Sequence, residues 1–311
     1  MGGLGLMFRR RAIQAHPTIT EGGYIDFADA EVFSILMTKG VSSDGVGITK
    51  EDCSKVSNID GWFKSNNTIT TFNEFKYFIG VSNLNPSNQW NGGAFYNCKG
   101  LKSISLPDSI ESAYSAFLGC SALTEVTFGA TSEISYSMFY GCSSLLSASL
   151  PKTILTIYDE AFYQCSQMGI VVNVPELQEI GVKAFAFSGI VGIADLGKIA
   201  ILKNEKKGQW YGVFHQCASL RFAILPSTLQ SIEAVMFKNC TALQGIVMKG
   251  ATPASIASDA FSLSNNCPIY VPSAAVDAYK SAWTSVASRI QDIANLPSAN
   301  SSLYSEIKQY L

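Results

Sequence analysis

A short apolar motif recurs along most of the chain at nearly constant intervals. A clear copy is Ala116-Phe117-Leu118-Gly119-Cys120, and the other copies keep the Phe and, in most cases, the Cys three residues after it. The eight phenylalanines of the motif are Phe95, Phe117, Phe139, Phe162, Phe185, Phe214, Phe237 and Phe261. Their spacing is 22 to 24 residues, except for the interval of 29 residues from Phe185 to Phe214. A period of this length and regularity predicts a repeat architecture.

The segment between two of these phenylalanines has a hydrophobic pattern of its own. A representative copy is Leu145-x-x-Ala148-x-Leu150-Pro151-x-x-Ile154. Apolar residues two apart predict a short strand with one buried face, and the proline ends the strand because it cannot donate to a central ladder. No single repeat can bury its own Leu, Ile and Phe, so its neighbours have to cover it. We therefore expect a solenoid of about eight rungs with short parallel strands, where a rung is one repeat wound once around the axis.

The segment before the repeats has the composition of a cap. A helix is predicted over residues 26–37, and a second helix begins after Thr49, whose side chain can form a capping box with Asp52. Six aromatic residues follow within residues 62–78. Such aromatic density beside the first rung suits a cover for the open end of a solenoid. We expect residues 21–80 to form a helical, aromatic-rich N-terminal cap.

The segment after the repeats predicts helices. Ser273 can cap one helix, and Leu303, Ile307 and Leu311 recur every four residues as an apolar stripe too short to be stable alone. We expect this stripe to dock either on its own solenoid or on another subunit, which would make a homo-oligomer. The expected regions are a basic N-terminal arm at 1–20, the cap at 21–80, the repeats at 81–272, and a helical C-terminal cap and tail at 273–311.

Composition limits the classes of function. The chain has 311 residues, of which 47% are hydrophobic and 15% charged, so it can bury a large core. Its net charge of -2 lacks the excess of Lys and Arg that a general nucleic-acid binder needs, so we expect no nucleic-acid partner. Apolar runs are too short to cross a bilayer, so we expect no membrane insertion.

The cysteines favour a structural role over a disulfide or metal role. Six of the eight occupy the same place in the repeat. Equivalent positions in stacked rungs point the same way, whereas a disulfide needs two side chains turned towards each other. Zinc sites use short Cys pairs, which this chain lacks. We expect a row of buried, reduced thiols, and no metal or cofactor.

The N-terminal arm combines a glycine-rich start with Arg9, Arg10 and Arg11. A secretory signal places its basic residues first and a run of apolar residues after them, and this order is inverted here. The arm is therefore expected to be either loosely held or a basic peptide that docks on an acidic partner.

Three of these motifs together resemble a known family. Leu-x-x-Ile-x-Leu-Pro followed by Ala-Phe-x-x-Cys resembles the leucine-rich repeat of BspA-like proteins, the type found in Bacteroidales and treponemes. Residues 69–78 resemble the lead-in of those proteins, and residues 267–272 with 276–280 and 289–290 resemble their C-terminal cap. The resemblance covers about residues 25–293. It implies an α/β leucine-rich-repeat solenoid with a helical N-terminal cap and a helical C-terminal tail.

The same resemblance implies a function class. Proteins of this family are usually extracellular or surface-anchored and bind host proteins, other bacteria or matrix. We therefore expect a binding or adhesion module that presents a solenoid surface to a protein or glycan. Similar repeats also occur in phages of gut Bacteroidales, and this chain shows no export signal at its start. A structural interaction protein of a virion is therefore the alternative, and the location stays open between cell surface and virion.

Two departures from the repeat supply candidate partner-binding residues. The extra residues between Phe185 and Phe214 predict a projecting loop, with Lys206, Lys207, Trp210 and Tyr211 at a cationic, aromatic tip. The alternative is that Trp210 folds back onto the core. Outward strand positions are polar in early rungs but become Phe222, Ile224 and Val247 in late ones. These three form either an exposed apolar contact patch or a surface that residues 271–311 cover.

The sequence offers little for catalysis. Its two histidines are His16 in the arm and His215 in the variable part of a rung, where a surface position is expected. The nucleophile, zinc-protease and phosphate-loop motifs are missing, and the carboxylates are scattered rather than paired. We expect a non-enzymatic protein.

Overall fold

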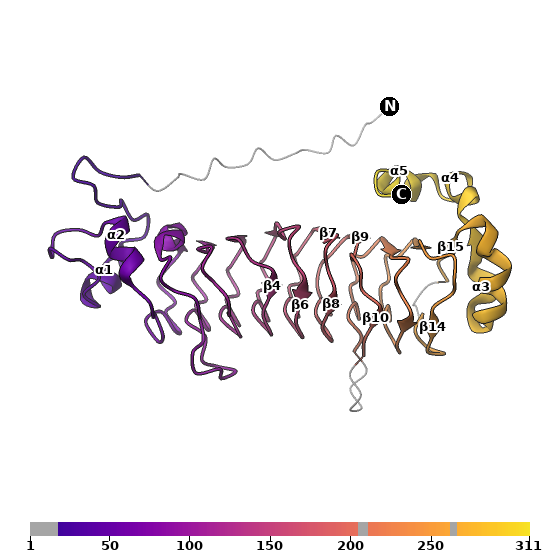
Figure 1. The fold of residues 1–311 in the computed structure, drawn as a ribbon, viewed down its shortest axis with the longest axis horizontal. Coiled ribbons are helices and arrows are strands. Elements are labelled where there is room, and N and C mark those ends of the chain that lie inside the picture. Colours follow the sequence, from indigo (N-terminus) through magenta and orange to yellow (C-terminus); the bar gives the residue numbers. More distant parts are fainter. Residues whose placement is uncertain (1–17, 205–210, 262–265) are drawn as a thin grey trace.

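Successive repeats wind around one axis and stack side by side, which gives the elongated molecule of Figure 1. This computed structural model describes residues 18–204, 211–261 and 266–311. Helices α1 (Ala30–Thr38) and α2 (Lys50–Lys55) lie at one end, and α3 (Val276–Ala282), α4 (Leu296–Ala299) and α5 (Ser301–Ile307) lie at the other. Short 3₁₀ helices occupy Asn73–Tyr77, Ser273–Ala275, Thr284–Arg289 and Ile293–Asn295.

The strands are two to four residues long and pair in parallel, rung to rung. The first strand of each repeat joins one of two sheets. These are β1 (Thr71–Phe72), β2 (Ser103–Ser105), β3 (Glu125–Thr127) and β5 (Ser147–Ala148), and then β7 (Val171–Asn173), β9 (Gly192–Asp195), β11 (Phe222–Leu225), β13 (Gly245–Met248), β15 (Ile269–Val271) and β16 (Ile290–Asp292).

The second strand of each repeat follows the turn after the first strand, and it joins one of two smaller sheets. The members are β4 (Glu133–Ile134), β6 (Thr156–Ile157) and β8 (Glu179–Ile180), and then β10 (Ile201–Leu202), β12 (Ser231–Ile232) and β14 (Ser255–Ile256). The prediction of a parallel-strand solenoid of about eight rungs with helices at its ends is confirmed.

The repeated phenylalanines form one internal column. Neighbouring rings from Phe95 to Phe261 stack with centroids 5.2 to 6.1 Å apart and planes within 15° of parallel. Every ring in the column is 4% exposed or less. Phe63, within the expected cap, extends the column by one position because its ring stacks on Phe95 at 5.3 Å. The column is the centre of the hydrophobic core.

The repeated cysteines form a second ladder beside the rings. Each Sγ donates to the carbonyl oxygen of the phenylalanine one rung earlier, as Cys120 does to Phe95 at 3.0 Å and Cys142 to Phe117 at 3.1 Å. The same bond joins Cys165 to Phe139, Cys217 to Phe185, Cys240 to Phe214 and Cys98 to Phe63. All eight cysteines are buried and unbridged. Each of these carbonyls also accepts a backbone N–H within its own turn, as that of Phe95 does from Cys98, so the thiol adds a second bond that links neighbouring rungs.

The turn around each phenylalanine has a fixed backbone shape. The residues two before and two after the ring take positive φ, as Ser137 (50°) and Gly141 (71°) do around Phe139. Glycine adopts this region without cost, but larger side chains rarely do. Phe187 nevertheless takes φ 61° at the position where Gly141 lies in its own rung. The regular turn therefore imposes strain on this bulky aromatic residue.

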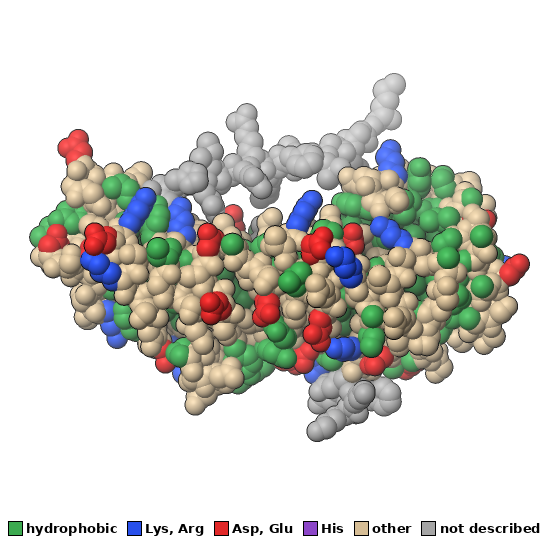
Figure 2. Space-filling view, viewed as in Figure 1, with side chains coloured by type: hydrophobic (Ala, Val, Ile, Leu, Met, Phe, Trp, Pro, Cys, Tyr) green, Lys and Arg blue, Asp and Glu red, His purple; other side chains and the backbone are tan. Residues whose placement is uncertain are grey.

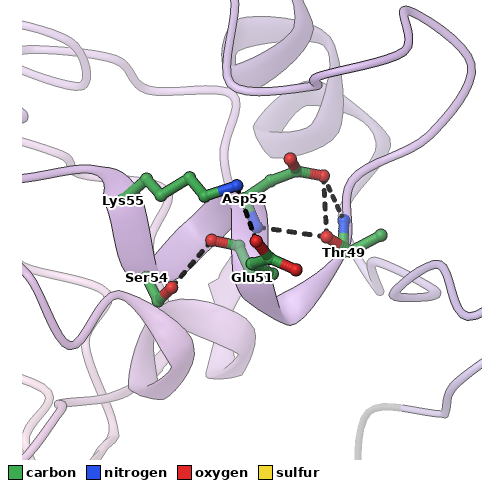
Figure 3. A network of polar contacts seen from close by, with 5 residues as sticks. All are labelled: Thr49, Glu51, Asp52, Ser54 and Lys55. Carbon is green, nitrogen blue, oxygen red and sulfur yellow. Dashed lines mark hydrogen bonds and ion pairs between the residues drawn. The ribbon is translucent and has the colours of Figure 1, made fainter.

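Both helices of the N-terminal cap have side-chain caps at their first turn, and the cap of α1 also binds Thr70, beside strand β1. Asp29 caps α1, and its second carboxylate oxygen accepts from the Thr70 backbone N–H at 2.6 Å and the Thr70 hydroxyl at 2.8 Å. Helix α1 therefore begins at Ala30, four residues later than predicted. The predicted capping box of α2 is confirmed, since Thr49 Oγ1 accepts from Asp52 N–H and Asp52 accepts from Thr49 N–H (Figure 3).

The C-terminal end is sealed by α3 and the residue after it. Trp283 is buried against Phe261 with ring centroids 5.3 Å apart, and its Nε1 donates to the carbonyl of Ala254 at 2.8 Å. The Tyr279 hydroxyl donates to the carbonyl of Gly250 at 2.9 Å. These bonds satisfy backbone groups of the last rungs that have no further rung to pair with.

Candidate interaction surface

The late apolar patch predicted from the sequence is covered. Phe222, Ile224 and Val247 are 2%, 1% and 1% exposed, and they form a cluster with Leu303 and Ile307 of α5. The expectation of an exposed contact patch is therefore wrong, because the C-terminal tail folds back over these strands. The alternative given by the sequence, a cover made of residues 271–311, is the one observed (Figure 1).

Several contacts hold this tail on its own solenoid. Arg221, beside β11, forms an ion pair with Glu306 at 3.0 Å, and the Asn300 side chain donates to the carbonyl of Gln244 at 3.5 Å. Gly245 leaves room for Leu303, since a Cβ there would lie 2.5 Å from the Leu303 Cδ2. Leu303 and Ile307 of the apolar stripe thus dock on strands of the same chain.

The 29-residue interval is described only at its two ends. The chain is described up to Asn204 and again from Tyr211, and Asn204 and Gly212 form an antiparallel bridge. The predicted projecting loop falls on residues 205–210, which lie outside the described residues. Lys206, Lys207 and Trp210 lie outside the described residues. Tyr211 is described and half-buried, with its ring 4.7 Å from His215 and 5.5 Å from Phe187. Of the four predicted tip residues, Tyr211 is therefore placed at the base, packed against the solenoid.

A loop over residues 85–92, which the sequence did not predict, projects from the solenoid. Its buried Asn85 donates to the carbonyls of Gln89 and Tyr114 at 2.7 and 2.8 Å, which fixes the loop to the next rung. Trp90, 44% exposed, packs edge-on against Tyr140 at 5.3 Å. The loop therefore presents an aromatic residue over rungs that follow it.

Two rows of aromatic side chains run along the solenoid from the loop of residues 85–92 onward. The tyrosine row consists of Tyr114, Tyr136 and Tyr158, with centroids 6.3 and 4.4 Å apart. The mixed aromatic row consists of Trp90, Tyr140, Tyr163, Phe187, Tyr211 and His215, with successive centroids 4.7 to 5.5 Å apart. Sequence reasoning missed both rows, although the tyrosine row recurs every 22 residues.

An ion pair lies beside the mixed aromatic row. Lys183 Nζ is 3.3 Å from Glu160 Oε1 and 5.7 Å from the centre of the Tyr211 ring. The Ser137 hydroxyl donates to Glu160 at 3.4 Å. All three residues occupy the same left-handed turn position of successive rungs. The pair neutralises itself, so this part of the edge carries no net charge.

The tyrosine row opens onto a groove of about 520 Å³. Its walls include Asn88 of the 85–92 loop, Glu111, Glu133 and the three tyrosines. Burial, with the nearby charges of Asp159 and Glu179, raises the pKa of the Tyr136 hydroxyl. Burial, with the charge of Glu133 and a hydrogen bond to it, raises the pKa of Tyr158. Figure 2 shows acidic and hydrophobic side chains close together along this edge. The groove is therefore aromatic and acidic.

His215 does not have the surroundings of a general base. It is 4% exposed rather than on the surface as predicted, and burial together with Lys238 lowers its pKa to about 4. The ring is neutral at physiological pH and packs between Tyr211 and Phe187. Within residues 18–204, 211–261 and 266–311, no cluster of His, Cys, Asp and Glu is placed to bind a metal ion.

The repeat pattern and the stacked rungs correspond to a known family model. The chain matches the BspA type leucine-rich repeat region in six copies, over residues 88–205 and 211–307. These ranges make up more than half of the chain. The chain belongs to the BspA-type leucine-rich repeat family. Among the described helices, none is both long enough and apolar enough to cross a bilayer.

Solved structures of leucine-rich repeat proteins are similar to parts of this chain. A T. pallidum leucine-rich repeat protein is 26% identical over 50% of this chain and 72% of its own, with a TM-score of 0.39. One from Bacteroides ovatus is 17% identical over 66% and 55%, with a TM-score of 0.41. The pneumococcal vaccine antigen PcpA is 17% identical over 61% and 40%, with a TM-score of 0.40. The chain thus spans about half the length of the last two proteins. No curated protein matches it.

Membership of the BspA-type family accounts for the inward side chains. The Phe column and the thiol ladder are the repeated, buried positions of the leucine-rich repeat. The outward side chains differ from rung to rung and decide what such a solenoid can bind. The two aromatic rows, which together form the aromatic edge, are the most distinctive outward feature of the described residues.

Proposed function

We propose that the protein is a non-enzymatic, protein-binding scaffold of the adhesion type, and that it binds through its aromatic edge. The observation that carries this proposal is the pair of aromatic rows, one of which begins at Trp90 on the projecting loop of residues 85–92. Tyr and Trp dominate the energetics of protein interfaces because they bury much apolar area with few rotatable bonds. Loops that leave a rigid scaffold are also where binding residues concentrate.

The rigidity of the edge supports the same proposal. The tyrosine backbones are held by hydrogen bonds to neighbouring rungs, as Ser115 N–H donates to the carbonyl of Tyr136 and Gly119 N–H to the carbonyl of Tyr140. The rings also contact one another at 4.4 to 6.3 Å. Binding a partner therefore orders few side chains that were previously free, which lowers the entropic cost of association.

A binding screen with matched variants tests this function. The full chain is screened against arrayed bacterial-surface, host and matrix proteins, and each hit is measured again with Tyr140→Ala plus Tyr163→Ala. Leu146→Ala is the control, because Leu146 is 52% exposed and outside both rows. The double variant is expected to weaken binding at least about tenfold, as loss of two interface aromatic residues does. A partner that binds the wild-type chain, the double variant and the Leu146→Ala control equally would contradict the proposal.

The location follows as a proposal from the same function. An adhesion module acts at the cell surface, and fractionation of the native cells tests this with antibodies to the folded chain. Recovery only from the cytosol would contradict it. A glycan partner is the remaining class within this function, and a glycan array measured with the same variants distinguishes it from a protein partner.

The alternative of a virion protein has less support from the structure than from the sequence. One of its observations was the apolar stripe of the tail, and Leu303 and Ile307 are now accounted for by docking on the chain's own strands. Mass spectrometry of purified particles tests this alternative directly, and absence from the particle would exclude it.

A further inference from the structure

Among the described residues, the groove beside the tyrosine row is lined by acidic side chains and by no Lys or Arg. Glu111 and Glu133 line it, and Asp159 lies close enough to raise the pKa of Tyr136. Lys203 is a cation in the neighbourhood, and its ammonium group is 2.7 Å from Glu179. Among the described residues, the ion pairs include neither Glu111 nor Glu133. The two exposed carboxylates thus face the groove without a cationic partner.

The orientation of the rings decides which ligand chemistry fits. Tyr136 and Tyr158 stack on each other at 4.4 Å with planes 28° apart, so each covers a face of the other. Tyr114 meets Tyr136 edge to face at 6.3 Å. A neutral sugar binds by stacking on a free ring face, and this row leaves few such faces. Hydroxyl oxygens and carboxylates remain, and these accept hydrogen bonds.

We propose that this groove binds an arginine side chain on an extended, basic segment of the partner protein. A guanidinium group donates five hydrogen bonds in a planar fork and pairs with carboxylates in a bidentate manner. Glu111 and Glu133 supply the carboxylates, the tyrosine hydroxyls accept further bonds, and Asn88 also lines the groove. This inference rests on the proposed protein-binding function and names the chemistry of the partner.

Labelled peptides measure the binding directly. The full chain is titrated with a short fluorescent peptide of alternating Gly and Arg, with its Lys counterpart and with its neutral Gln counterpart, and anisotropy is recorded. The Arg peptide is expected to bind tightest, the Lys peptide more weakly and the Gln peptide not at all. Affinity for the Arg peptide is expected to fall as ionic strength rises, because exposed charges are screened.

Matched variants locate the site. Glu111→Gln plus Glu133→Gln is expected to weaken Arg-peptide binding about tenfold, since two charge-assisted contacts are lost. Glu176→Gln plus Glu51→Gln is the control, because it removes the same charge at two exposed glutamates that pair with Lys198 and Lys55. Tyr136→Phe removes one hydroxyl but keeps the ring, and is expected to weaken binding less than the double variant.

The outcomes separate this inference from the proposed function. Equal weakening by the two double variants would show non-specific attraction and overturn the inference. Binding of a neutral oligosaccharide in place of the Arg peptide would overturn it in favour of a glycan. If no peptide binds while screened partners still depend on Tyr140 and Tyr163, the inference fails and the protein-binding function stands.

Discussion

At the scale of single residues, the stability of the molecule depends on side chains that repeat in every rung. Phe139 contacts the ring before it and the ring after it at 5.4 Å, and it has no exposed area. The thiol of Cys142 sits three residues away and donates to the carbonyl of Phe117. Each rung therefore contributes one ring, and six of them also one thiol, whose partners lie in neighbouring rungs.

Truncating a ring of the column should be costly. Phe139→Ala is expected to lower the free energy of unfolding by about 3 to 5 kcal/mol, because it removes buried surface and leaves a cavity between two rings. Chemical denaturation measures this change. Leu146→Ala, at an exposed position of the neighbouring strand, should change the same quantity by less than about 0.5 kcal/mol. Equal effects of the two substitutions would argue against the column.

The buried thiols should give the protein a marked sensitivity to alkaline pH. Burial raises the pKa of the Cys217 thiol from 9.0 to about 12, and it raises those of Cys120, Cys165 and Cys240 as well. In the unfolded chain these thiols ionise near pH 9, whereas in the folded chain they stay protonated. Stability is therefore complete below pH 9 and falls as pH rises from there towards 12, by about 1.4 kcal/mol per pH unit for each such thiol.

Two measurements check this behaviour. Urea unfolding of the wild-type chain and of Cys217→Ala at increasing pH should show a shallower alkaline loss in the variant, which lacks one titrating thiol. A thiol reagent should find eight reactive cysteines in denaturant and almost none in the native state. A count well below six in denaturant would instead show that disulfides form.

At the scale of elements, the C-terminal tail is a cover with its own small core. The cluster of Phe222, Ile224, Val247, Leu303 and Ile307 is separate from the main hydrophobic core around the Phe column. The Tyr270 hydroxyl and one Glu306 carboxylate oxygen are buried there without a hydrogen-bond partner. Two unsatisfied polar atoms reduce the net stability of this contact.

Charge placed under the tail should release it without unfolding the solenoid. Leu303→Asp is expected to expose the apolar strands, because a buried unpaired carboxylate is strongly unfavourable. Binding of a hydrophobic dye should rise, while the main unfolding transition changes little. Ser305→Asp, at an exposed position of α5, is the control. Unchanged dye binding in Leu303→Asp would contradict the described docking.

At the scale of the whole molecule, each rung is stabilised by its neighbours, so damage at one end should stay near that end. Trp283 covers Phe261 and the last rungs, and no further rung lies beyond it. Trp283→Ala should raise hydrogen exchange in residues 231–292 and leave residues 60–120 unchanged, because stability along a solenoid is a sum of neighbouring contacts. Trp90→Ala, on an exposed loop, should change neither region. Uniformly faster exchange along the chain would indicate one cooperative unit instead.

Inward positions were predictable because every rung repeats them. The Phe position recurs eight times and the Cys position six times, mostly at a period of 22 to 24 residues, so the column and the thiol ladder follow from the sequence. The capping box of α2 was predictable because Thr49 and Asp52 are close in sequence. The start of α1 was missed because its cap, Asp29, is chosen partly by its bond to distant Thr70.

Outward positions were harder to predict because their neighbours lie in other rungs. Tyr114, Tyr136 and Tyr158 show no burial pattern, and only their shared period indicates that they form a row. The docking site of the tail was left open because α5 is short and its contacts with Phe222 and Val247 are long-range. The position of Tyr211 depends in the same way on Phe187, one rung earlier.

The constant step between stacked rings makes the solenoid a ruler. Phe95 follows the loop of residues 85–92 and Phe214 follows Tyr211, and five ring-to-ring steps of 5.2 to 6.0 Å separate the two phenylalanines. Excision of residues 117–138 would place Phe139 over Phe95 and bring the 85–92 loop nearer to Tyr211 by one step of about 5 Å. Gain or loss of one repeat is thus a way to adjust the distance between the two ends of the mixed aromatic row in fixed increments, while the packing inside every remaining rung is preserved.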